Sequence, residues 1–390
     1  MTNKIINSFN KLKSTLESVS LDSRFKGYDP FDGLNSPIIK NTFLGRNRLV
    51  RLIMVQFFKR SPINLRPLLG VKKTENPQAL AVFLSGYCKL YSKENNPSVL
   101  KTIVFLADRI ISLRKTSWSG ACWSYPFAWQ ARAFYQPENT PLIIPTAYCF
   151  NALLDAYEIT KNEYHKEVAL SSSTFVLKDL NRTTEGSTFA FSYSPKDNSV
   201  VFNASLMASQ VLARCYSFTK ENHLKKEALS SVQYCINNQN RNGSWVYGKQ
   251  PFHQWIDSFH TGYNLVCLMD YAKYCDDKSF DTHISNGLDY YLDTFFNEDG
   301  FSKYFNVSHY PLDVNNAAQL IVTLEKAQKL LIKKELVTSV INYIISNLQS
   351  SNGMFFYQKH KMFTNKIIYL RWSNSWMFNA LSILSTKLYA

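Results

Sequence analysis

A turn that recurs along the chain constrains the fold more than any other feature of the sequence. Its clearest copy spaces Gln239, Gly243 and Trp245 as Gln-x-x-x-Gly-x-Trp. Glycine can adopt a positive φ just past the end of a helix, and the tryptophan then returns to the core. Marker glycines recur at intervals of 50 to 66 residues and are followed by aromatic residues from the second one onward: Gly70, Gly120, Gly186, Gly243, Gly300 and Gly353. The chain therefore reads as a series of repeats.

Two kinds of helical segment alternate between these glycines. The first kind is apolar on nearly every side, which is typical of a buried helix, and covers residues 77–93, 142–160, 201–218, 258–275, 312–330 and 372–388. The second kind is amphipathic and charged, and covers residues 99–115, 162–180, 221–239, 281–297 and 333–349. Six inner and about six outer helices predict an all-α (α/α)6 toroid of six helical-hairpin repeats, with short β-like turns between the repeats.

The N-terminal part of the chain precedes the first repeat. We predict one domain for residues 1–390, in which residues 1–69 form a helical extension packed on or beside the toroid. Residues 41–60 combine apolar side chains with five Lys or Arg residues. A basic amphipathic helix of this kind can lie on an anionic membrane, or it can be a core helix with a solvated basic face. The sequence leaves both interpretations open.

The net charge and the cysteines restrict the partners. Lys and Arg exceed Asp and Glu by 15, which favours an acidic partner. The positive charge is spread along the chain and no zinc-finger or aromatic RNA-binding signature occurs, so we expect no nucleic acid. An anionic membrane surface or a polyanion, such as an acidic oligo- or polysaccharide, stays open as the partner. The seven cysteines form no C-x-x-C pair and lie mostly in apolar segments, which indicates buried, reduced thiols.

The remaining composition bears on cofactors and location. No metal-ligand spacing occurs among the seven His and seven Cys residues, so neither a metal nor a cofactor is predicted. The N-terminus lacks a hydrophobic signal region, and no run of about 18 apolar residues occurs. We therefore expect a cytoplasmic protein, with a peripheral location at the inner membrane as an open alternative.

The turn at residues 239–245 resembles the QW signature of the terpenoid cyclase and prenyltransferase toroids. Residues 349–355 are a near copy with Phe in place of Trp. The catalytic motifs of that superfamily are missing from this sequence. The sequence has no Asp-x-Asp-Asp motif of protonating cyclases, no convincing diphosphate motif, no zinc set of protein prenyltransferases and no Cys-His pair of lanthionine cyclases.

A closer resemblance covers nearly the whole chain. The sequence is similar to bacterial toroid proteins encoded in capsule, O-antigen and exopolysaccharide clusters, which are often described only as prenyltransferase-like. The similar stretches are residues 28–36, 123–127, 255–263, 310–316 and 369–376. This resemblance implies polysaccharide biosynthesis or modification. Toroids of related shape include lyases, unsaturated-uronide hydrolases and sugar epimerases.

Polar and aromatic residues cluster at the predicted starts of the inner helices. All inner helices run in one direction, so these clusters share one rim, where helix N-termini favour an anion and aromatic walls suit sugar rings. Arg132 or Arg371 could clamp a carboxylate bidentately. The candidate substrate-binding residues of the rim are Tyr125, Trp129, Arg132, Tyr193, His253, Trp255, His309, Asp313, Asn315, Arg371 and Trp372.

The densest polar cluster supplies the candidate catalytic residues. Asp257, His260 and Tyr263 are spaced three residues apart, which places them near one helical face. Asp257 would orient His260 as a general base, and Tyr263 would protonate the opposite face of the sugar or a leaving oxygen. With a uronate, this set predicts epimerase- or lyase-type proton abstraction. The alternative is structural: Asp257 caps its helix, His260 is a core histidine and Tyr263 packs.

Three other functions stay open at this point. Asp313 lies one repeat after Asp257, so the two carboxylates could be the acid/base pair of a glycoside hydrolase, although Asp313 also suits a helix cap. A non-catalytic toroid would bind the glycan or organise the synthesis machinery. A prenyltransferase- or terpene-cyclase-like enzyme would need a deep apolar tunnel and an acidic diphosphate–Mg site.

Overall fold

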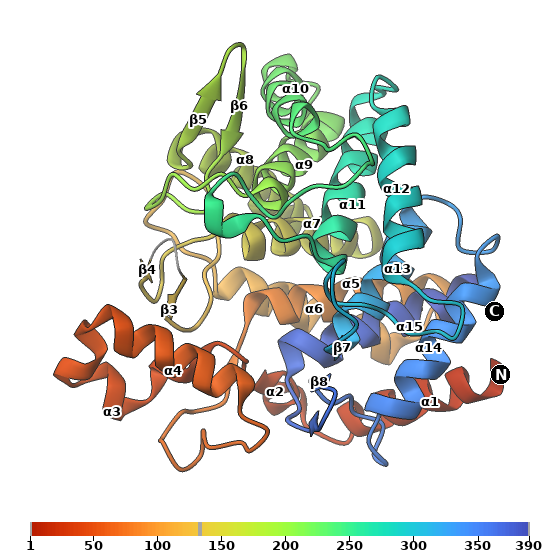
Figure 1. Ribbon diagram of the computed structural model, residues 1–390. Helices are drawn as coiled ribbons and strands as arrows, with labels where there is room; N and C mark the ends of the chain where they lie inside the picture. The colour runs from red at the N-terminus through yellow and green to blue at the C-terminus, as the bar shows by residue number, and fades with distance from the viewer. Residues whose placement is uncertain (1, 132–134, 389–390) are drawn as a thin grey trace.

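Six inner helices form a closed ring in the computed structural model, which describes residues 2–131 and 135–388. Each inner helix packs against the next, and the last packs against the first. The inner helices are α5 (Pro77–Glu94), α7 (Ile143–Thr160), α9 (Phe202–Thr219), α11 (Ser258–Cys275), α13 (Val314–Lys326) and α15 (Ser375–Lys387) (Figure 1). The predicted (α/α)6 toroid is confirmed.

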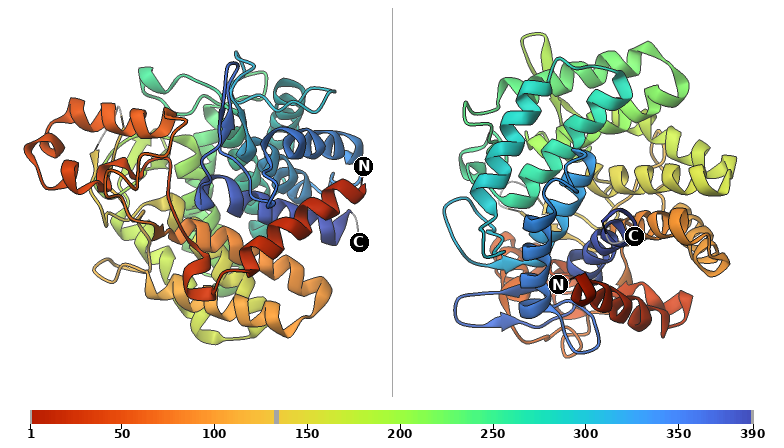
Figure 2. Two further views of the ribbon diagram at one scale, coloured as in Figure 1. Left: turned by 90° about the horizontal axis from the view of Figure 1, so that it is seen from below. Right: turned by 90° about the vertical axis from the view of Figure 1, so that its right-hand side faces the viewer.

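The outer layer contains the five amphipathic helices that the sequence predicts. They are α6 (Pro97–Ser112), α8 (Glu163–Asp179), α10 (Asn222–Asn237), α12 (Asp281–Phe295) and α14 (Lys334–Leu348). The sixth outer helix is α1 (Thr2–Glu17), which packs against α14 and α15 and brings the two ends of the chain close together (Figure 2). The first helix of the expected N-terminal extension is therefore part of the ring. The assignment of residues 1–390 to one domain stays a prediction.

The Gln-x-x-x-Gly-x-Trp turn links an outer helix to the outer helix of the next repeat. The Gln239 side-chain amide donates to Gly243 O at 2.9 Å and to His283 O, in α12, at 3.0 Å. Gly243 has a φ of +88°, and a Cβ on it would overlap the Asn286 carbonyl of α12. Only glycine fits because both the backbone conformation and the close approach exclude a side chain.

The second copy of this turn shows why α1 closes the ring. The Gln349 amide donates to Gly353 O at 2.8 Å and to Ser8 O, in α1, at 3.2 Å. Gly353 has a φ of +91° and lies against the α1 backbone. The turn that joins α10 to α12 thus joins α14 to α1, so α1 holds the sixth outer position.

Short antiparallel strands and turns lie in the loops between the helices. The strand pairs are β1 (Lys26–Gly27) with β2 (Thr74–Glu75), β3 (Trp129–Gln130) with β4 (Tyr135–Gln136), and β5 (Arg182–Glu185) with β6 (Thr188–Phe191). A three-stranded sheet, β7 (Leu312–Asp313), β8 (Gln358–Lys359) and β9 (Thr364–Asn365), joins the loops before α13 and α15. The other short elements are α2 (Leu21–Arg24), α3 (Pro37–Lys40), α4 (Arg48–Arg60), the 3-10 turns Asp32–Asn35, Phe43–Arg46 and Pro251–His253, and the π-helical turn Leu370–Asn374.

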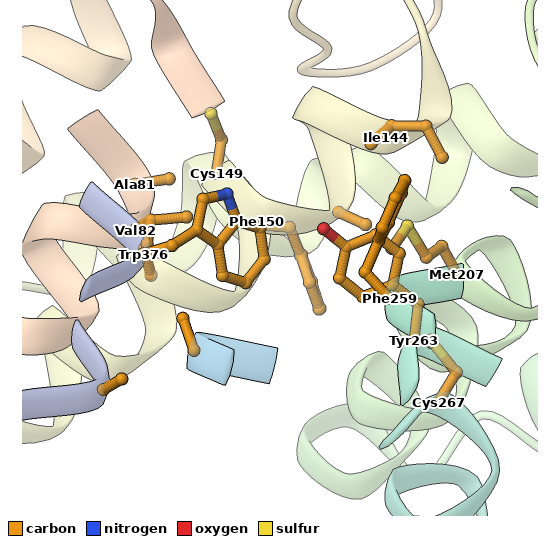
Figure 3. Close-up of a cluster of buried hydrophobic side chains, with 14 of the residues drawn as sticks. Ala81, Val82, Ile144, Cys149, Phe150, Met207, Phe259, Tyr263, Cys267 and Trp376 are labelled. Carbon is orange, nitrogen blue, oxygen red and sulfur yellow. The ribbon is translucent and has the colours of Figure 1, made fainter. Parts of the chain in front are cut away.

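One hydrophobic core extends through the ring from α1 to the end of α15. Figure 3 shows its central layer, where Trp376 of α15 and Tyr263 of α11 lie near the middle with Phe150 and Met207. All seven cysteines are buried and free, which confirms that prediction. None of the helices in the described residues is both long and apolar enough to cross a bilayer.

Candidate active site

The start of α11 holds a carboxylate and an imidazole in contact. Asp257 is the N-cap, and its Oδ1 accepts a hydrogen bond from His260 N at 2.9 Å. Its Oδ2 lies 2.7 Å from His260 Nδ1 and also accepts from Trp255 Nε1 at 3.1 Å. An ionised carboxylate only accepts, so Nδ1 carries the proton and Nε2 is the basic nitrogen of the neutral ring.

Burial separates the roles of these two residues. The Asp257 side chain is 2% exposed, whereas the His260 side chain is 21% exposed. One oxygen of Asp257 caps the helix while the other holds the imidazole, so capping and orientation coexist in one residue. His260 is an accessible histidine with a buried carboxylate behind it, which is the arrangement of a base and its orienting group.

Tyr263 lies one turn further along α11, beneath His260. The two rings are 5.8 Å apart, and Tyr263 stacks on Trp376 at 5.6 Å (Figure 3). Its hydroxyl accepts a hydrogen bond from Asn315 Nδ2 at 3.3 Å. Burial raises the pKa of Tyr263 far above its ordinary value. The hydroxyl is therefore protonated at neutral pH, so in a reaction it can act as a general acid but not as a general base.

Asp313 at the start of α13 is sealed by its own chain. Its Oδ1 accepts from Asn315 N at 2.8 Å, as an N-cap does. Its Oδ2 accepts from Gln358 Nε2 at 2.5 Å and from Trp372 Nε1 at 3.0 Å. The residue is fully buried, and burial raises its pKa to about 6. Trp372 therefore holds Asp313, and this carboxylate has no surface open to a substrate.

Lys59 of α4 brings a cation to the rim. It is half-buried, and its Nζ lies 5.1 Å from the centre of the Phe31 ring. Burial lowers the pKa of Lys59, while the carboxylates of Asp313 and Asp257 act on it in the opposite direction. The ammonium group is therefore within electrostatic range of both carboxylates. The sequence identified α4 only as an amphipathic helix and gave no signal for this position.

The Arg371 clamp exists, but the carboxylate it binds belongs to the protein. Its Nη2 donates to Asp29 Oδ1 at 2.8 Å, and its Nε donates to Asp29 Oδ2. Its Nη1 also donates to Gln78 Oε1 at 3.3 Å, which accepts from the Tyr125 hydroxyl at 2.9 Å. All of these groups are buried. Arg371 and Tyr125 therefore hold the rim together, and the expectation that Arg371 clamps a substrate carboxylate is corrected.

The same loop carries a second buried ion pair. Arg66 donates to Asp32 Oδ1 at 2.5 Å and to the backbone oxygen of Asp29 at 2.7 Å. Both pairs involve residues 28–36, and Arg371 lies in residues 369–376. Each of these stretches was already notable in the sequence, but nothing in it indicated that the two meet.

Aromatic side chains form the rest of this rim. Trp255 is exposed and stacks on Tyr247 at 4.6 Å. His253 packs edge-on against the same tyrosine at 5.0 Å, and burial lowers its pKa. Trp129 lies 6.2 Å from Tyr193. These residues belong to the loops that lead into α7, α9 and α11, and their role as a sugar-binding wall stays a prediction.

Two candidate residues do not join this group. His309 is exposed and stacks on Phe301 at 3.8 Å, and Phe301 in turn packs on Tyr343 of the outer helix α14. His309 is therefore on the outer side, apart from His260. Arg132 lies outside the described residues.

A cavity of about 440 Å³ opens inside the ring, on the other side of the Tyr263–Trp376 layer. Its walls carry ion pairs among apolar side chains, with distances of 2.6 Å for Lys326–Asp270, 2.8 Å for Arg214–Asp155 and 2.6 Å for Lys89–Glu325. Within residues 2–131 and 135–388, no three His, Cys, Asp or Glu side chains come together as a metal site.

Comparisons with known proteins find likeness in fold alone. No protein-family model and no curated protein matches the sequence. Among solved structures, cellobiose 2-epimerase from Bacillus thermoamylovorans is similar, with a TM-score of 0.63 and 12% identity over 80% of this chain and 88% of that chain. A polysaccharide lyase gives a TM-score of 0.56 and 13% identity over 79% and 88% of the two chains. Unsaturated glucuronyl hydrolase from a Bacillus species gives 0.59 and 10% identity over 81% and 88%.

Proposed function

We propose that the protein modifies an acidic, uronate-containing glycan by proton abstraction, with His260 as the general base. One observation carries the proposal: a buried carboxylate fixes Nδ1 of an imidazole whose ring reaches solvent at an aromatic rim. A helix cap alone would not need the second oxygen of Asp257 to hold an accessible histidine. The arrangement satisfies the geometric requirements of a base and its orienting residue.

The proposed reaction uses groups of this chain only. His260 Nε2 takes the proton from the carbon next to the uronate carboxylate, and the electron pair moves into the carboxylate. The Asp257 charge stabilises the imidazolium, and the Lys59 ammonium stabilises the negative charge on the sugar. Tyr263 then donates its proton to the opposite face of that carbon, which inverts it, or to the leaving glycosidic oxygen, which breaks the chain. Solvent returns a proton to Tyr263 and takes one from His260.

The comparisons support a carbohydrate as the substrate class. An epimerase, a lyase and a hydrolase of unsaturated glucuronides share this fold. The resemblance to toroid proteins of capsule and exopolysaccharide clusters supports a role in polysaccharide biosynthesis, on the glycan or on its precursor, in the cytoplasm. The paired-Asp hydrolase is less well supported, because both oxygens of the buried Asp313 accept hydrogen bonds from the protein itself.

The test is product formation from oligosaccharides that contain glucuronate, galacturonate or mannuronate. Wild-type protein, His260→Ala and the matched control His309→Ala would be compared. We expect His260→Ala to lose product formation while its circular dichroism and Tm stay those of the wild type, and His309→Ala to stay active. Full activity of His260→Ala would rule out the proposal.

The products identify the reaction. An inverted uronate indicates an epimerase, and an unsaturated uronate indicates a lyase. New reducing ends without unsaturation, lost on Asp313→Asn and kept on His260→Ala, would indicate the hydrolase instead.

A further inference from the structure

The segment that contains α3 and α4 projects from the side of the ring (Figures 1 and 2). Its helix α4 turns apolar side chains toward solvent: Leu49 is 64% exposed, Ile53 56% and Phe57 46%. These residues are spaced four apart and form one stripe. Phe43, in the turn before the helix, is 78% exposed. Because a soluble surface rarely carries such a continuous apolar stripe, this one marks an interaction site.

Further exposed apolar side chains flank α4 in the sequence. These are Ile38, Phe43, Ile63 and Leu68. We call the stripe of Leu49, Ile53 and Phe57 the α4 face. The opposite side of α4 is ordinary core, since Val55 and Phe58 are buried. The helix therefore has an internal apolar side that folds the segment and an external one with no function in folding.

Charge distinguishes this segment from the rest of the protein. Residues 33–74 contain nine cationic and no acidic residues, so this short stretch supplies nine of the fifteen net positive charges. Arg46 and Arg60 are exposed at the two ends of α4. Neither forms an ion pair with an acidic side chain in the described part of the chain. Their charge is therefore available to an anionic partner.

We propose that the α4 face docks on an anionic membrane surface. Apolar side chains would enter the boundary between headgroups and acyl chains, and the arginines would contact acidic headgroups. A second copy of the chain fits less well, because its α4 face would bring nine like charges against nine. The contact is peripheral, since no described helix can span a bilayer.

The docking site adjoins the candidate active site. A groove of about 830 Å³ runs between α4 and β3 and is lined by Ile53, Phe57, Phe31 and Trp129. Phe31 is also the ring over which the Lys59 ammonium lies, at 5.1 Å. Where the proposed function holds, docking presents the rim to a glycan attached to a membrane lipid, with the lipid end in the groove.

The test is co-sedimentation of the full-length protein with vesicles that contain no glycan. Vesicles of phosphatidylcholine alone would be compared with vesicles that also contain phosphatidylglycerol. The apolar variant is Leu49→Ser/Ile53→Ser, and the charge variant is Arg46→Gln/Arg60→Gln. The matched control is Leu331→Ser/Ile332→Ser, which removes an equally exposed apolar pair beside lysines in the loop between α13 and α14.

We expect wild type and control to bind the anionic vesicles, and both α4 variants to bind them roughly tenfold less well or worse. Added salt should release the wild type. Equal binding to both vesicle types, unchanged binding of Leu49→Ser/Ile53→Ser, or loss of binding in the control alone would overturn the proposal. So would a concentration-dependent dimer that the apolar variant abolishes. His260→Ala should bind vesicles as the wild type does, so failure of docking and failure of the proposed reaction are distinguishable.

Discussion

The starts of α11 and α13 are equivalent positions in adjacent repeats, yet they differ in chemistry. Both begin with an Asp N-cap, Asp257 and Asp313, that accepts a hydrogen bond from the first helical turn. Three residues after the cap, α11 has His260, which bonds back to the carboxylate, whereas α13 has Asn316, which donates to Lys303 O at 3.0 Å. One cap therefore holds an accessible base, while the other carries a sealed carboxylate. An N-cap carboxylate therefore orients a base only when its second oxygen bonds a histidine in the next turn, as in α11. In α13 the second oxygen is occupied by Gln358 and Trp372.

Exchanging each carboxylate for an amide gives the largest contrast between the two starts. Asparagine keeps the cap, but at position 257 it can no longer stabilise a charged imidazole. We expect Asp257→Asn to lower kcat/KM roughly 10²–10⁴-fold and Asp313→Asn to change it by less than about tenfold. Steady-state kinetics on the active uronate substrate would measure both. The opposite order would assign the chemistry to α13.

At a third helix start, that of α15, the charge of Arg371 is paired with Asp29 within the protein. Arg371→Ala would leave the buried Asp29 carboxylate without its partner, at a cost of about 3–5 kcal/mol. Urea unfolding measures this loss, and the double variant Asp29→Ala/Arg371→Ala should recover part of it. A stable Arg371→Ala protein with a raised KM would show instead that Arg371 serves the substrate.

The pH dependence of stability should identify the sealed carboxylate. The folded-state pKa of Asp313 is raised from 3.8 to about 6, so the folded protein binds this proton more tightly than the unfolded chain does. The resulting stabilisation is present below about pH 4 and is lost as the pH rises through about 6.

Asp313→Asn removes that titration. The free energy of unfolding of the wild type relative to this variant should therefore fall by up to about 3 kcal/mol between pH 4 and 7. The pKa of Asp32 is also raised to about 6. Because Asp32 titrates in both proteins, its contribution cancels in the difference between their free energies of unfolding. A difference that stays constant with pH would contradict the sealed environment of Asp313.

Lys59 gives the smallest expected effect. Lys59→Met should raise KM for a uronate substrate by roughly three- to tenfold, because one partly solvated charge contact is lost, with kcat changed less. Lys101→Met, at an exposed position of the outer helix α6, is the matched control and should leave KM unchanged. Equal effects of the two substitutions would place the substrate carboxylate elsewhere.

The sequence predicted the fold because each repeat is specified locally. Marker glycines and segments apolar on every side define five outer and six inner helices without long-range information. Closure of the ring by α1 was not predicted, since it depends on contacts across the whole chain. The sequence nevertheless contained a signal. The turn at Gly353 needs an outer helix to pack against, but the segment that follows it, residues 372–388, is an inner helix. The missing outer helix therefore had to come from another part of the chain.

In the candidate site, too, contacts within one helix were predicted and contacts between distant segments were not. The spacing of Asp257, His260 and Tyr263 follows from one helical turn, and the structure brings these residues together. The Asp29–Arg371 bridge and the approach of Lys59 join segments far apart in the sequence, so spacing could not reveal them. Arg371 was misjudged for this reason, as its partner is 342 residues away.

Release of a carbon-bound label tests the central claim most directly. A uronate oligosaccharide carrying deuterium on the carbon next to the carboxylate would be incubated with the wild type, and deuterium in the solvent would be measured. Inversion and elimination both break that bond, so we predict release by the wild type and none by His260→Ala. Products that form while the deuterium stays on the sugar would contradict proton abstraction by His260.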